Sequence, residues 1–187
     1  MKNIPLSLAL LLLALAIGCK KTDNEPQMPA PTHDGRRVVA WKLDGKVYIA
    51  QGRIGFGDWA GDGFLGYETA PWSAYYIYLS GSYINEQSNT VNRVSVNIKC
   101  PFNHEINRPI TFWNYPFRGR VSDMRNASST IPTGSNEFLT DSLHRGTLVV
   151  TYEDSATISG TFKMDVVNDE GKVLHITDGM FDVPKQL

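Results

Sequence analysis

Few residues of this chain stand at spacings that support acid–base or nucleophilic chemistry. Its histidines are His33, His104, His144 and His175. None belongs to an H-E-x-x-H zinc motif, no G-x-S-x-G nucleophile turn is present, and no Cys/His pair has zinc spacing. Asp141, Ser142 and His144 supply the residue types of a hydrolase triad, but triad members normally converge from different elements, so we interpret them as a polar turn. A hydrolase built on two carboxylates that meet only in the fold stays open as the weaker alternative.

A glycine-rich stretch at residues 52–72 is the second place where chemistry could reside. A connection of this length is usually functional or mobile. Asp58 and Asp62 offer hard oxygen ligands for Ca²⁺ beside a glycine turn, but the third acid and the closing glutamate of a known calcium loop are missing. We therefore expect turn-capping aspartates, no metal site and no cofactor, with calcium as the less favoured alternative.

Aromatic residues crowd the same stretch and the strand that follows it. The candidate ligand-binding rings are Trp59, Trp72, Tyr76 and Tyr78. Flat rings beside carboxylates such as Asp58 and Asp62 suit the apolar face of a sugar, so we predict a non-catalytic binding module for glycan or another envelope component. Packing of these rings in the core is the competing interpretation, because a domain of this size needs several large side chains.

Period-two alternation follows the chain almost throughout, without a convincing helical repeat. Two strands flank Asp44-Gly45, the strongest short hairpin signal, because both central residues of that turn need positive φ. Further strands are predicted at residues 74–80, 91–100, 110–113, 146–152, 157–167, 172–177 and 180–183. Turns at residues 168–171 and at Asp178-Gly179 would join the last three into an antiparallel meander. The pattern predicts an all-β fold, an antiparallel two-sheet β-sandwich with a distorted β-barrel as the alternative.

Cys100 shares the apolar side of its strand with Val94, Val96 and Ile98. Nothing in the sequence activates it, so we expect a buried, reduced, structural thiol.

The N-terminus carries the clearest targeting signal of the chain. Lys2 precedes a short apolar run that ends at Gly18, which is typical of a secretory signal and too brief for a stable membrane span. Residues 16–19 (AIGC) resemble the lipobox of bacterial lipoproteins, and this resemblance implies cleavage before Cys19 and its lipidation with palmitate-type acyl chains. We predict a signal peptide at residues 1–18, a lipidated Cys19 that begins a flexible tether over 19–36, and one domain at 37–187.

A lipid anchor at Cys19 would place the protein in the bacterial cell envelope, on the outer membrane, either periplasmic or surface-exposed. The net charge of −1 implies no polyanion, so no nucleic-acid partner is expected. A structural or assembly subunit of an outer-membrane complex is the alternative to the binding module.

Residues 41–46 (WKLDGK), 146–152 (GTLVVTY), 158–162 (ISGTF) and 176–183 (ITDGMFDV) resemble segments of a family of small cell-envelope lipoproteins of Bacteroidota. The resemblance covers both ends of the domain and implies an all-β lipoprotein with no catalytic residues to carry over. Ser142 and Ser155 lie in Asp-Ser-apolar sequences that resemble O-glycosylation sites of exported proteins in these bacteria.

Overall fold

The fold consists of two β-layers that face each other across one core. The computed structural model describes residues 26–51, 64–69, 75–85, 92–101, 104–114, 117–123 and 137–186. Its strands are β1 (Val38–Leu43), β2 (Lys46–Gln51), β3 (Phe64–Thr69), β4 (Tyr75–Asn85), β5 (Asn92–Pro101), β6 (Pro109–Phe112), β7 (Gly119–Asp123), β8 (Glu137–Leu139), β9 (Gly146–Glu153), β10 (Thr157–Val167) and β11 (Val173–Gln186). The described part of the chain contains no helical segment with the length and apolar character that a bilayer crossing requires.

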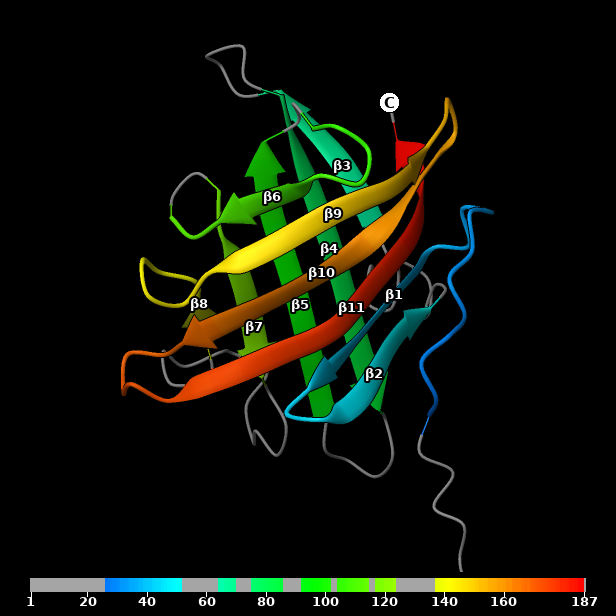
Figure 1. Ribbon diagram of the computed structural model, residues 1–187. Helices are drawn as coiled ribbons and strands as arrows, with labels where there is room; N and C mark the ends of the chain where they lie inside the picture. Colours follow the sequence, from blue (N-terminus) through cyan, green and yellow to red (C-terminus); the bar gives the residue numbers. More distant parts are fainter. Residues whose placement is uncertain are drawn as a thin grey trace, which may run out of the picture.

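The front layer of Figure 1 has the strand order β2-β1-β11-β10-β9-β6, and the back layer has the order β3-β4-β5-β7-β8. The layers are joined at two corners. The end of β11 pairs in parallel with β3 through Lys185↔Leu65, and the end of β10 pairs with β8 through Val167↔Leu139. The predicted all-β fold is confirmed, and the two corner pairings explain why both the sandwich and the distorted barrel describe it.

The predicted hairpin at Asp44-Gly45 is present. Asp44 has φ 48° and Gly45 has φ 85°, and β1 pairs with β2 from Leu43↔Lys46 onward. The same turn is tied to the neighbouring strand, since the amide of Asp44 donates to the carbonyl of His175 at 3.1 Å.

The prediction of a second turn at Asp178-Gly179 was wrong. Residues 173–186 form one strand, in which a β-bulge falls between the pairs Phe162↔Gly179 and Met164↔Ile176. Asp178 has φ 50°. Some bulges, like tight hairpin turns, contain a residue with positive φ, so the Asp-Gly signal does not distinguish this bulge from a turn.

The strands β3, β7 and β8 were not predicted, and β3 lies inside the stretch that we expected to be irregular. β3 is held on both sides by long-range partners, with its full length paired to β4 and its start paired to the end of β11. Such pairing depends on the fold and overrides a weak local pattern.

The core lies between the layers and follows the predicted alternation. Val94, Val96, Ile98 and Cys100 are all fully buried. Burial raises the pKa of the free Cys100 thiol to about 12, so it remains protonated and inert, as predicted.

Gly160 shows why a glycine is needed within the alternating strand β10. A Cβ at this position would lie 2.1 Å from the carbonyl oxygen of Val149 and 2.6 Å from the ring of Phe181. The close approach of these two groups fills the core where a side chain would otherwise stand.

Candidate functional site

Residues 26–36, which we name the strap, lie on the outer face of the front layer. Of the flexible tether that we expected over residues 19–36, residues 19–25 lie outside the described residues, as do Cys19 and the predicted signal peptide, and residues 26–36 make the following contacts with the sheet. The buried carboxylate of Asp182 on β11 holds the strap by accepting hydrogen bonds from the amides of Asp34 at 3.2 Å and Gly35 at 2.9 Å, and from the Thr32 hydroxyl. The hydroxyl of Ser159 on β10 donates a further bond to Asp182 at 3.0 Å. A segment rich in proline is therefore fixed by one acceptor that satisfies several of its donors.

The hydrogen bonds at Asp182 also set its charge. Burial alone would raise its pKa, but the donors from Thr32, Gly35, Ser159 and Asp34 outweigh that effect and lower the pKa below its usual range. Asp182 is therefore ionised at neutral pH, and each of its donors forms a charge-assisted hydrogen bond.

Two apolar contacts fix the strap on either side of Asp182. The ring of His33 stacks on Tyr152 of β9 with centroids 4.5 Å apart. Met28 packs on a small apolar cluster of the outer face that includes Val38, Ala40 and Met180. The strap is thus attached to the front layer along its length.

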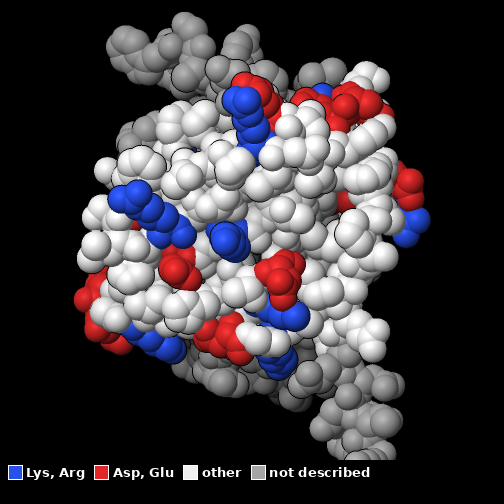
Figure 2. Space-filling model, in the orientation of Figure 1, with Lys and Arg blue, Asp and Glu red and all other residues white. Residues whose placement is uncertain are grey.

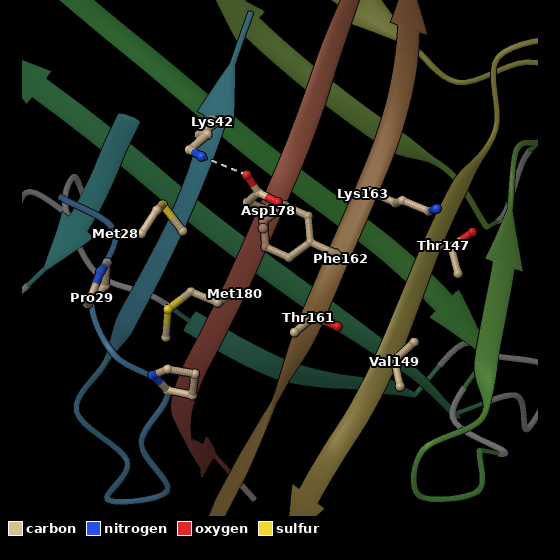
Figure 3. Close-up of a pocket in the computed structure, with 12 residues that line it drawn as sticks. Met28, Pro29, Lys42, Thr147, Val149, Thr161, Phe162, Lys163, Asp178 and Met180 are labelled. Atoms are coloured by element: carbon tan, nitrogen blue, oxygen red, sulfur yellow. Dashed lines mark ion pairs between the residues drawn. The ribbon is translucent and has the colours of Figure 1, made fainter. Parts of the chain in front are cut away.

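Between the strap and the outer faces of β1, β9, β10 and β11 lies a groove of about 520 Å³ (Figure 3). Its lining residues are Met28, Pro29, Pro31, Lys42, Thr147, Val149, Thr161, Phe162, Lys163, Asp178, Gly179 and Met180. In Figure 3, Met28 and Pro29 stand on one side of the groove, and Lys163, Thr147 and Val149 stand on the other. The volume is within the range of about 300–1,000 Å³ typical of small-molecule sites.

The charged groups of the groove are few. Lys42 and Asp178 form an ion pair at 2.8 Å and neutralise each other. Among the described residues, Lys163 has no ion-pair partner, and it points outward from β10. Figure 2 shows that basic and acidic side chains are interspersed on this side of the molecule, with uncharged surface between them.

The four residues predicted from the glycine-rich stretch, Asp58, Trp59, Asp62 and Trp72, lie outside the described residues. Tyr76 and Tyr78 belong to β4 and are paired with Pro101 and Lys99 of β5. They are in phase with Ser80 and out of phase with the buried Leu79, but their side chains are also outside the described part.

Asp141, Ser142 and His144 form the polar turn that the sequence predicts. One carboxylate oxygen of Asp141 accepts from the amides of His144 at 2.6 Å and Leu143 at 2.8 Å, and it also contacts Nδ1 of His144 at 2.9 Å. The amide of His144 is the main reason that the pKa of Asp141 is lowered. The carboxylate thus closes the turn, while Ser142 is exposed.

The second Asp-Ser sequence has the same geometry. Asp154 Oδ1 accepts from the amides of Ala156 at 2.8 Å and Thr157 at 2.7 Å, and Ser155 is exposed at the turn. Both candidate modification sites are therefore at accessible turns closed by the preceding aspartate.

His104 and His175 each contact a carboxylate. His104 lies 2.8 Å from Glu153, which also pairs with Lys185 at 2.5 Å. Burial opposes the ionisation of Glu153, but Lys185 and His104 outweigh it and lower its pKa. His175 is an exposed strand residue, as predicted, and its bond to Asp165 at 2.7 Å raises its pKa.

Histidine, cysteine and acidic side chains of the described ranges nowhere gather in a group of three that would hold a metal ion. A smaller depression of about 230 Å³ on the back layer is lined by Asn97, Lys99, Arg118 and Arg120. Glu137 pairs with Arg120 there at 2.9 Å.

Sequence reasoning missed both the strap and the groove. The signals that could have indicated them are Asp182, an acid within an otherwise apolar strand end, and the apolar residues Met28, Pro29 and Pro31 ahead of the first strand. Comparison of the chain with models of known protein families, with curated proteins and with solved structures finds no match in any of the three.

Proposed function

We propose that this protein is a lipid-anchored binding module of the bacterial cell envelope, with Cys19 as the anchor and the groove as the ligand site. The observation that carries the proposal is the groove itself, an apolar recess on an outer sheet face that usually carries polar side chains. Its ligand would be a component of the envelope in which the anchor places the protein.

The strap supports this proposal. A proline-rich segment that only linked the domain to a membrane would not need a buried carboxylate to hold it. Here the bonds to Asp182 position Met28, Pro29 and Pro31 as the wall of the groove. Binding sites are generally largely preformed, because a fixed wall lowers the entropy that the ligand must lose.

The pairing of the described histidines favours binding over hydrolysis. His33 stacks on Tyr152, His144 is engaged in a turn, and His104 and His175 contact the carboxylates of Glu153 and Asp165. None of these four lines the groove.

Hydrogen–deuterium exchange of the full lipidated chain in nanodiscs tests the proposal. Separate lipid, glycan and peptide fractions of envelope material would be added, and exchange would be followed by mass spectrometry. We expect one fraction to slow exchange in the strap and in β9–β10. A Val149→Glu variant places a charge in the groove and should lose this protection, whereas Val173→Glu, on the outer face of β11 and not among the lining residues, should keep it. No protection by any fraction would contradict the proposal, and protection confined to the edge strands β2 and β6 would favour the assembly role instead.

A further inference from the structure

We infer that the ligand of the groove is a single-chain anionic lipid whose acyl chain lies along the strap and whose head group meets Lys163. This inference rests on the proposed function and names the ligand class. It follows from what lines the groove, how charge is distributed in it, and where the strap leads.

The lining suits methylene groups better than a sugar ring. Met28, Pro31, Val149 and Met180 are flexible or aliphatic groups that make dispersion contacts with a chain. Among the described residues that line the groove, Phe162 is the one aromatic residue, and it is only 3% exposed. The described part of the lining therefore presents no flat ring on which a sugar could stack.

The charges of the groove favour an anion at one end. Lys42 and Asp178 cancel, which leaves the ammonium of Lys163 as the net charge of the lining. Thr161 shares β10 with Lys163, and Thr147 of β9 is the register partner of Lys163. The hydroxyls of both threonines can donate to a carboxylate or phosphate. In Figure 3, Lys163 and Thr147 stand across the groove from Met28 and Pro29, with Val149 on the Lys163 side and the Lys42–Asp178 pair on the Met28 side. The chain of an amphiphile whose head group meets Lys163 would therefore pass Val149 and cross the groove toward the strap.

The strap leads back to the predicted anchor. Met28 follows Cys19 by nine residues, and an extended chain spans at most about 3.3–3.6 Å per residue, so a lipidated Cys19 would keep Met28 within about 30 Å of the bilayer. The source of the ligand is then the adjacent membrane. A groove of about 520 Å³ suits one acyl chain and not two, which points to a fatty acid or a lysolipid.

Photo-crosslinking in isolated membranes tests the inference with the full lipidated chain. The probes are a diazirine-bearing palmitate analogue and the same chain with an alcohol head, and crosslinked peptides are mapped by mass spectrometry. We expect palmitate crosslinks on the strap and on β9–β11. Lys163→Gln should reduce them about three- to tenfold at limiting palmitate probe and leave alcohol-probe crosslinks unchanged. Lys172→Gln, which removes an exposed charge outside the groove, should change neither.

Val149→Glu should abolish groove crosslinks with both probes, whereas Val173→Glu should retain them. Near-ultraviolet circular dichroism checks that Val149→Glu is folded, and Thr161→Glu serves as the second blocking variant. Crosslinks spread over the surface and insensitive to both blocking variants would overturn the inference. Protection of the strap by glycans in the exchange experiment, without groove crosslinks, would overturn the lipid ligand while the binding function stands; protection by no fraction would contradict both.

Discussion

Ser159 and Asp182 are register partners in the β10–β11 pair, and the Ser159 hydroxyl donates to the Asp182 carboxylate at 3.0 Å. Both side chains are buried although they belong to the outer face of the sheet, because the strap covers them. This pair holds the strap, which forms one side of the groove.

Asp182→Asn should release the strap. The amide keeps one acceptor but loses the charge, and its NH2 group faces either the Asp34 amide or the Gly35 amide, which donate to different oxygens of Asp182, so we expect a loss of about 1–3 kcal/mol of stability. Urea unfolding measures the loss, and limited proteolysis within residues 26–36 reports the release. Asp169→Asn in the exposed β10–β11 turn is the control and should change neither. An intact, protected strap in Asp182→Asn would show that other contacts hold it.

Acid should release the strap in the same way. The pKa of Asp182 is lowered in the fold, so its stabilising contribution is complete above the unfolded-state pKa of about 3.9 and is lost as pH falls through the lower folded-state value. Exchange or proteolysis of the strap between pH 6 and pH 2 should therefore show protection down to about pH 4 and release below it. The same titration of Asp182→Asn should lack this transition, and a strap released near neutral pH would contradict the assignment.

Gly160→Ala should be strongly destabilising. The added methyl group would meet the Val149 carbonyl and the Phe181 ring, and overpacking of this kind costs about 1–3 kcal/mol or more. Gly45→Ala is the matched control, since its cost comes only from the positive φ of an open turn and should be about 1 kcal/mol. Equal midpoints of the two variants in thermal unfolding would contradict the packing argument.

Labelled palmitate should be incorporated into the wild-type chain in its bacterial host and not into Cys19→Ala. Cys100→Ala should be labelled normally, because Cys100 is buried in the core. Mass spectrometry should find a mature N-terminus at Cys19 with acyl groups attached. An intact leader on an unlabelled product would refute the lipid anchor.

Ser142 and Ser155 should carry glycans when the protein is made in a bacterium that modifies Asp-Ser-apolar sequences. Both serines are exposed at turns closed by the preceding aspartate, which makes them accessible to a transferase. Intact mass should fall by one glycan in each of Ser142→Ala and Ser155→Ala. Ser159→Ala, at a buried position, should leave the glycan content unchanged. An unmodified wild-type mass would exclude both sites.

The local part of this fold could be predicted from sequence, and the long-range part could not. The Asp44-Gly45 hairpin and the inward side of Val94, Val96 and Ile98 depend on φ preferences and period-two alternation, which neighbouring residues determine. The strap depends on Asp182 meeting Asp34 and Gly35 across about 150 residues of chain, and no local pattern encodes that meeting. The groove could not be predicted for the same reason, because the strap that forms one side and the strands β9–β11 that form most of the rest are far apart in the sequence.

The bulge at Asp178-Gly179 has a consequence for everything after it in β11. Ile176 points into the core before the bulge, and Phe181 and Val183 do so after it, although strict alternation from Ile176 would turn both outward. The extra residue of the bulge thus exchanges which positions of the strand, odd or even, point into the core. In a regular strand of the same length, the side chain of Asp182 would point inward among apolar side chains. The outward direction of this carboxylate therefore depends on the bulge between Ile176 and Gly179.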